Sequence, residues 1–121
     1  MLKYDIDNII LKYEDILTLT ISIKKDEYDK DYIYLDLIIV KDCFKNSNKG
    51  IGSKFLTDLK LIADNNNTYI TLTAEDIITD INILKKFYTK NGFTYNNYFD
   101  FLTGNFYYIS KNLLNDSRYI A

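Results

Sequence analysis

Two glycines stand one residue apart, directly ahead of an apolar run with helical spacing. They are Gly50 and Gly52 in "NKGIGSKFL", residues 48–56, where a lysine stands on either side of the pair. The first N–H groups of a helix lack partners within the helix and carry the positive end of its dipole. Glycines at that point let an anion such as phosphate lie against bare backbone. The segment is therefore a candidate phosphate-binding loop, and the alternative is a loop that only turns a strand into a helix.

Two widespread phosphate motifs do not fit this segment. A Walker loop needs four residues between its first glycine and a Gly-Lys pair, and the sequence "GIGSK" lacks that spacing. A dinucleotide-binding fingerprint needs a third glycine where Phe55 stands, together with a larger parallel sheet. The ligand of such a loop would have to be a different phosphate compound.

The chain contains no histidine and a single cysteine, Cys43. Histidine-based triads, histidine-ligated metals and zinc clusters are thereby excluded, and we expect no metal site. A lone cysteine without a histidine to activate it is also a poor acyl-carrying nucleophile. Any chemistry must use Tyr, Asp, Glu, Ser, Lys or backbone groups.

The charge balance bears on partners and location. A formal charge of −2 and a pI near 5.0 give no excess of Lys and Arg that could follow a nucleic-acid backbone. No apolar run approaches the length that spans a membrane, and a single cysteine suits a reducing compartment. We expect a cytoplasmic protein that binds neither nucleic acid nor membrane.

The candidate residues must be positioned by one small domain, because 121 residues suffice for a single core and no linker or repeat divides residues 1–121. Alternation predicts strands at 17–23 and 32–40, joined as a hairpin by a polar turn at 28–31. Residues 6–14 are short and Ile-rich, and we predict a further strand there, a short helix being the alternative.

After Gly50 the apolar period changes to that of a helix, which should stop at "DNNN", residues 64–67. A strand at 68–73 follows, and then a second helix that ends at Asn91-Gly92. The tail, residues 93–113, should form two aromatic strands around a turn at 103–105. The predicted fold class is α/β, or more finely α+β.

The order of these elements and two motifs resemble the GNAT superfamily of acyl-CoA-dependent N-acyltransferases. One motif is the glycine loop after a buried strand, similar to the family's Gln/Arg-x-x-Gly-x-Gly/Ala pyrophosphate loop. The other is "FYTKNGF", residues 87–93, similar to a Phe-Tyr-x-x-x-Gly-Phe stretch. The resemblance covers about residues 30–113 and implies a mixed, mostly antiparallel sheet flanked by helices. The family's N-terminal strand and two helices do not fit into residues 1–30.

The resemblance implies acetyl-CoA, or coenzyme A, as the cofactor. The strand edge at 37–40 would pair with the amides of pantetheine, and the N–H groups of residues 48–53 would hold the pyrophosphate. The motif's basic position falls on Ser47, with Lys45 as a displaced alternative, and Asn82 stands beside the position of a usual asparagine. The full set of implied cofactor residues is Leu37, Ile38, Ile39, Val40, Lys45, Ser47, Asn48, Lys49, Gly50, Ile51, Gly52, Ser53, Asn82 and Tyr88.

The resemblance also implies a catalytic role for Tyr88, which its apolar spacing alone would assign to the core. A phenol of pKa about 10 can protonate, or donate a hydrogen bond to, a departing thiolate whose acid has a pKa of about 8.5. The base is left open. Glu75 follows a strand, Asp36 lies within one, and the free-amine fraction of the acceptor can also suffice.

The predicted function is the transfer of an acyl group, most simply acetyl, from acetyl-CoA to a primary amine of a small molecule or protein by direct attack. The alternative is an inactive CoA-binding or protein-interaction module on a reduced GNAT fold. Because the helices that normally wall the acceptor groove are missing, we also expect a homodimer, paired through the tail strands at 98–102 and 105–109.

Overall fold

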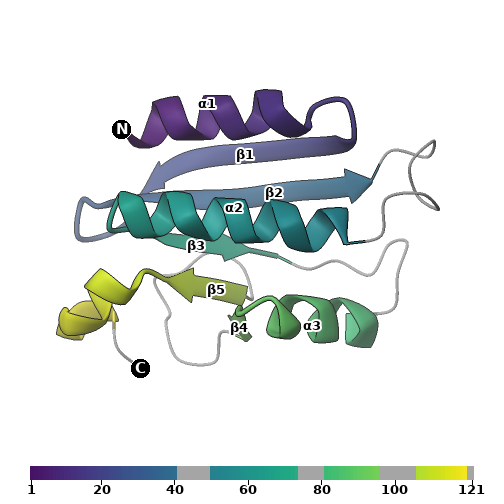
Figure 1. Cartoon of the computed structure of the whole chain (residues 1–121). Coiled ribbons are helices and arrows are strands. Elements are labelled where there is room, and N and C mark those ends of the chain that lie inside the picture. Colours follow the sequence, from purple (N-terminus) through teal and green to yellow (C-terminus); the bar gives the residue numbers. More distant parts are fainter. Residues whose placement is uncertain (41–49, 74–80, 96–105, 120–121) are drawn as a thin grey trace.

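The computed structural model describes residues 1–40, 50–73, 81–95 and 106–119, in which helices and strands alternate along the chain (Figure 1). The helices are α1 (Leu2–Tyr13), α2 (Ile51–Asn65) and α3 (Ile81–Lys90), followed by two short 3-10 helices, η2 (Lys111–Asn115) and η3 (Ser117–Tyr119). The strands are β1 (Leu17–Lys25), β2 (Asp31–Val40), β3 (Tyr69–Leu72), β4 (Thr94–Tyr95) and β5 (Phe106–Ile109). The predicted α+β class is confirmed.

The described strands form one five-stranded sheet in the order β1-β2-β3-β5-β4. The β1–β2 hairpin is antiparallel as predicted, β2 and β3 are parallel, and β5 lies antiparallel between β3 and β4. This is the mixed, mostly antiparallel sheet that the resemblance implies. The parallel pair is the natural place for a site, because both of its strands end at the same edge.

Each face of the sheet carries its own apolar cluster. Side chains of α1, α2 and α3 pack with Leu17, Ile33, Leu35, Ile70 and Leu72 into the larger core on one face. On the other face, where Tyr32 and Tyr69 stack with ring centroids 4.9 Å apart, the C-terminal 3-10 helices add Leu113 and Tyr119. The alternation along β2 and β3 assigns successive residues to the two clusters.

The ends of α2 and α3 follow the predicted signals. The α2 helix begins after Gly50, buries Phe55, Leu56, Leu59 and Ala63, and gives way to Asn67 in a left-handed conformation with φ of 51°. The α3 helix is followed by Gly92 with φ of 87°, a conformation that glycine adopts without strain. Both predicted stop signals are confirmed.

The prediction of a strand at 6–14 is wrong, because residues 2–13 form α1. Ile6, Ile9 and Tyr13 recur at helical spacing and are almost fully buried. Tyr13 donates a hydrogen bond of 2.5 Å to Asp58 of α2, which also pairs with Lys12 at 2.9 Å. Burial of an amphipathic face against α2 outweighs the low helix propensity of its β-branched residues.

The tail also differs from its prediction. The segment 93–113 contains two paired strands, β4 and β5, but residues 111–115 form a 3-10 helix instead of strand. The predicted turn at 103–105 lies outside the described residues. β5 has β3 on one side and, over Phe106 and Tyr107, β4 on the other, so little of its edge is left for a second copy. The homodimer itself stays a prediction.

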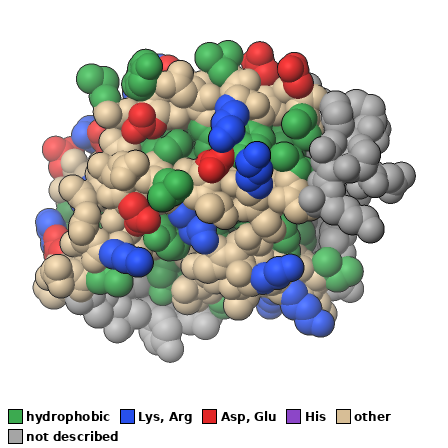
Figure 2. Space-filling view, viewed as in Figure 1, with side chains coloured by type: hydrophobic (Ala, Val, Ile, Leu, Met, Phe, Trp, Pro, Cys, Tyr) green, Lys and Arg blue, Asp and Glu red, His purple; other side chains and the backbone are tan. Residues whose placement is uncertain are grey.

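No helix in the described residues is long and apolar enough to cross a membrane. The visible face in Figure 2 intersperses Lys and Arg with Asp and Glu. This face therefore presents no basic stripe of the kind that follows a nucleic-acid backbone.

Candidate active site

The parallel strands β2 and β3 separate near the carboxyl end of the sheet. Their pairing runs from Ile33 opposite Ile70 to Leu35 opposite Leu72, whereas β2 continues to Val40. In the described residues, the edge of β2 that faces β3 therefore has no strand partner over residues 36–40. Its backbone N–H and C=O groups are available to an extended ligand with amide groups, such as pantetheine.

A β-bulge lies where the two strands separate. Thr20 of β1 pairs with Leu37 and the next residue, Ile21, pairs with Leu35, so that Asp36 is the extra residue of β2. A bulge bends its strand and increases the local twist. Here it coincides with the end of the β2–β3 pairing, and it could not be predicted from the alternation along the sequence.

The N-terminus of α2 begins at Gly50, which adopts a left-handed conformation with φ of 82°. No side chain caps this end, and no acidic residue lies in the first turn. A Cβ added to Gly50 would meet nothing within 4 Å among the described residues. Within the described residues, the N–H groups of Ile51, Gly52 and Ser53 therefore begin a helix with room for an anion and with no carboxylate in its first turn.

Gly52 also has a packing role that the sequence does not predict. A Cβ at this position would lie 3.1 Å from Cζ of Phe87 on α3. The absence of a side chain thus allows the first turn of α2 and the side chain of Phe87 to pack closely. The motif around Tyr88 includes Phe87 but assigns it no role. No local sequence signal indicates a contact between Gly52 and Phe87, which are far apart in the chain.

Tyr88 lies next to Phe87 and is buried, with 6 % of its surface exposed. Its ring lies among those of Phe87, Phe93 and Phe106, with centroids 5.2, 6.1 and 5.4 Å away. Burial raises the pKa of the Tyr88 phenol above its usual value. The raised pKa keeps the hydroxyl protonated at neutral pH, so it is a group that can donate a hydrogen bond to a ligand.

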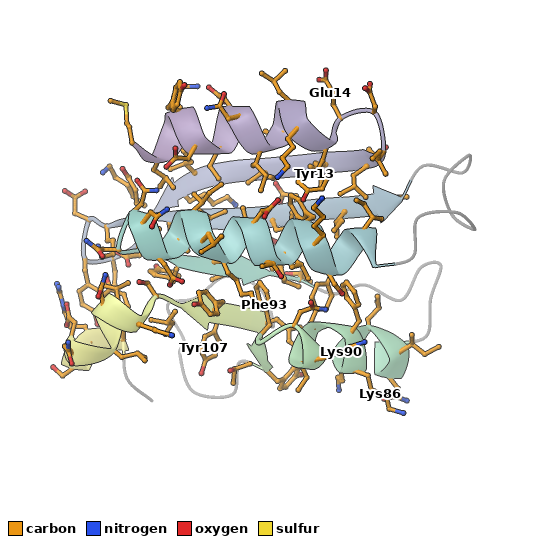
Figure 3. All side chains as sticks on the ribbon, viewed as in Figure 1. Tyr13, Glu14, Lys86, Lys90, Phe93 and Tyr107 are labelled. Carbon is orange, nitrogen blue, oxygen red and sulfur yellow. The ribbon has the colours of Figure 1, made fainter. Side chains whose placement is uncertain are left out.

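The aromatic contact with Phe106 places Tyr88 near the opening between β2 and β3. Phe106 of β5 pairs with Leu72 of β3, and Leu72 pairs with Leu35 of β2, the last parallel pair. All three side chains belong to the same core as Tyr88. The structure therefore brings together the phenol, the α2 N-terminus through Phe87, and the point where the strands separate. Phe93, labelled in Figure 3, is the third aromatic ring that contacts Tyr88, besides Phe87 and Phe106.

Asp36 lies on the opposite face of the sheet. It accepts a hydrogen bond of 3.1 Å from Ser22, whose strand partner is Tyr34, while Leu35 points into the core that contains Tyr88. The side chain of Asp36 is exposed. The strand itself is buried at Ile33 and Leu35, but the Asp36 carboxylate is exposed beside the opening and can meet an acceptor from that face.

Several predicted residues can be located only in part. Glu75, Lys45, Ser47, Asn48 and Lys49 lie outside the described residues. Ile38 and Ile39 are half-buried, and for Leu37 and Val40 the structure describes the backbone pairing alone. Asn82 is exposed in the first turn of α3. In the described ranges, no three Asp, Glu or Cys side chains gather as metal ligands would.

The fold that these elements build is the GNAT fold, as two solved structures with the same architecture show. The first is the anti-CRISPR protein AcrVA5, with a TM-score of 0.55 and 24 % identity over 77 % of this chain and 88 % of that one. The second is Naa50 of Arabidopsis thaliana in complex with the bisubstrate analogue CoA-Ac-MVNAL, with a TM-score of 0.52 and 21 % identity. That match covers 78 % of this chain and 62 % of Naa50.

Neither a protein-family model nor a curated protein sequence matches the chain. At identities below 25 %, the likeness to the two solved structures establishes the fold, and the residues of the site must carry any statement about chemistry.

Proposed function

We propose that this protein is a CoA-dependent N-acyltransferase that transfers an acetyl group from acetyl-CoA to a primary amine. The GNAT fold supports the proposal, because Naa50, which shares it, is complexed with a compound in which CoA is joined through an acetyl group to a peptide. The observation that carries the proposal is the opening between β2 and β3, with an uncapped helix N-terminus at Gly50 and a protonated phenol at Tyr88.

The described residues fit coenzyme A in two respects. The backbone of residues 37–40 would pair with the amides of pantetheine, and the N–H groups of Ile51, Gly52 and Ser53 would hold the pyrophosphate. Among the described residues, nothing lies within 4 Å of a Cβ at Gly50 and no acidic residue lies in the first turn of α2, as binding of a dianionic group requires. Bound there, acetyl-CoA supplies an acyl thioester.

Tyr88 would donate its proton, or a hydrogen bond, to the sulfur as negative charge develops on it. Its raised pKa makes the phenol a weaker acid than an exposed tyrosine, so a strong hydrogen bond is the main contribution, with proton transfer following cleavage. The surrounding aromatic rings exclude water and strengthen that hydrogen bond.

The acceptor amine must reach the thioester without its proton. Asp36, next to the opening and held by Ser22, would attract a protonated amine and accept its proton directly or through water. Glu75 is the other candidate base. An exposed carboxylate is a weak base, so the small fraction of free amine in solution can also supply the nucleophile. A cytoplasmic location stays part of the proposal.

The experiment is mass spectrometry of the protein incubated with acetyl-CoA and a mixture of amines that includes polyamines, aminoglycosides and peptides with free N-termini. The proposal predicts a product 42 Da heavier, the mass that acetylation adds, and an equal amount of free CoA. If CoA binds and no amine in the mixture is acetylated, the result favours the alternative of a CoA-binding module. If CoA does not bind, both readings of the site are wrong.

A further inference from the structure

The outer edge of β1 is the longest strand edge without a partner in the described part of the sheet. β1 spans nine residues, Leu17–Lys25, and pairs only with β2, whereas the strand at the other end of the sheet, β4, has two residues. Figure 1 shows β1 and α1 together at one side of the molecule, far from α3 and β4. A long edge strand offers a row of N–H and C=O groups to a further strand.

The side chains of β1 are incompletely covered. Leu19, Ile21 and Ile23 belong to the core face but are only half-buried, unlike the corresponding residues of β2, Ile33 and Leu35. The alternate residues, Thr18, Thr20 and Ser22, are small and uncharged. Lysines, which often protect an edge strand from pairing, stand only at its end, at positions 24 and 25.

The charges at the two ends of β1 are opposite. Glu14 and Asp15 precede the strand and are exposed, and neither forms an ion pair within the described residues. Lys24 and Lys25 end the strand and are also exposed, and Lys25 pairs with Asp31 of its own chain at 3.0 Å. An antiparallel copy of the same strand would bring each acidic end against the basic end of the other.

We propose that the β1 edge is the interface for a second copy of this chain, which pairs antiparallel around a two-fold axis at Thr20. In this register Leu19 lies opposite the partner's Ile21, and Thr18 lies opposite the partner's Ser22. Asp15 then lies beside the partner's Lys25. From Leu17 to Ile23 each pair matches apolar with apolar or polar with polar, and each side chain stays on its own face of the sheet.

The α1 helix supports the same arrangement. Its residues Asp5 and Lys12 contact α2, and at 100° per residue Lys3 and Glu14 lie on the opposite flank, toward the open side of β1. Figure 3 shows Glu14 projecting away from α2, whereas Tyr13 points toward it. The two-fold axis sets the two α1 helices antiparallel on one face, so that Lys3 of each copy lies near the acidic end of the other. The surface is thus self-complementary, as a two-fold interface requires.

Light scattering over a range of concentrations tests the state of the full chain. We expect twice the 14.3 kDa mass of one copy, and a dissociation constant that rises at least about tenfold for Lys25→Glu or Asp15→Lys alone, because like charges then meet across the interface. The double exchange Asp15→Lys with Lys25→Glu should restore the dimer. Lys86→Glu, on the exposed side of α3, is the matched control and should change nothing.

A cross-link tests the register. In a Cys43→Ser background, Thr20→Cys should form a disulfide-linked dimer in an oxidising buffer, since directly opposed antiparallel residues lie about 4.5–5.5 Å apart. Thr18→Cys should not, because its two copies would be separated by about 13 Å at about 3.4 Å per residue. A monomer at every concentration would overturn the proposal. So would a dimer whose dissociation constant is unchanged by Asp15→Lys or Lys25→Glu and that cross-links equally through Thr18→Cys and Thr20→Cys.

Discussion

Gly52 of α2 packs against Phe87 of α3: a Cβ on Gly52 would lie 3.1 Å from the ring of Phe87. The residue after Phe87 is Tyr88, and the residues before Gly52 begin α2 at Gly50. This contact therefore fixes the proposed anion-binding helix end relative to the proposed hydrogen-bond donor.

Gly52→Val should destabilise the protein by about 1–3 kcal/mol, because a branched side chain must displace the Phe87 ring in a packed core. In urea titrations, Gly52→Val combined with Phe87→Ala should cost less than the sum of the two single changes. Strictly additive free energies would mean that the two positions do not share this space.

Substitutions at Gly50 separate backbone strain from charge. Asn and Asp both tolerate the left-handed conformation, and they differ mainly in the negative charge. At a CoA concentration about a hundredfold above its Kd, the wild type should gain about 2.7 kcal/mol of stability. We expect a smaller gain in thermal melts for Gly50→Asn and none for Gly50→Asp. Equal gains for the two variants would place the phosphates elsewhere.

Asp26, in the β1–β2 turn, binds the C-terminal segment through hydrogen bonds. Its Oδ2 accepts hydrogen bonds from Tyr69 at 2.7 Å and Tyr119 at 2.8 Å, and its Oδ1 accepts from the N–H groups of Tyr28 and Lys30. Burial alone would raise the pKa of Asp26, but these hydrogen bonds outweigh it and the pKa lies below its usual value.

A lowered pKa in the folded state means that the stability from Asp26 is fully present above the ordinary aspartate pKa, near 4, and is lost as pH falls through the folded value. Asp26→Asn should cost about 1–3 kcal/mol at pH 7. The difference from wild type in chemical denaturation should shrink below about pH 4. A difference that is constant from pH 7 to pH 3 would contradict the ionised, hydrogen-bonded carboxylate.

The pH dependence of catalysis tests the state of Tyr88. Since burial raises its pKa, the phenol stays protonated across the neutral and mildly alkaline range, and its ionisation should not lower kcat below about pH 10. The rate should instead rise with pH as the acceptor amine loses its proton. A fall in kcat with an apparent pKa below 9, absent in Tyr88→Phe, would show that the phenol ionises too readily for this role.

Periodicity predicted much of this fold, and its failures have identifiable causes. Alternation predicts the two strands of the hairpin, helical spacing predicts α2, and Gly92 predicts the end of α3. In α1 the β-branched, Ile-rich composition favours a strand, whereas the helical spacing of Ile6, Ile9 and Tyr13 favours the helix that forms. Burial of the Ile6, Ile9 and Tyr13 face against α2 stabilises the helix, and this tertiary contact cannot be predicted from a local sequence pattern.

The site could be predicted less completely than the fold. The glycine loop and the motif around Tyr88 predicted the elements on which the proposed site is built, the start of α2 and the end of α3. The bulge at Asp36 and the contact between Gly52 and Phe87 depend on how strands and helices meet, and the hydrogen bond from Tyr119 to Asp26 joins residues 93 positions apart. Such relationships arise from packing and leave no signal in short windows of sequence.

The release of free CoA from acetyl-CoA by Tyr88→Phe, with a competent amine present, tests the central claim most directly. The substitution keeps the ring and its contacts with Phe87, Phe93 and Phe106, so folding and CoA affinity should change little. Tyr108→Phe is the matched control, because the Tyr108 hydroxyl donates to Asp64 and is not part of the proposed site. The account predicts a kcat about a hundredfold lower for Tyr88→Phe with KM almost unchanged, and a wild-type kcat for the control. Equal rates of CoA release by the wild type and Tyr88→Phe would contradict it.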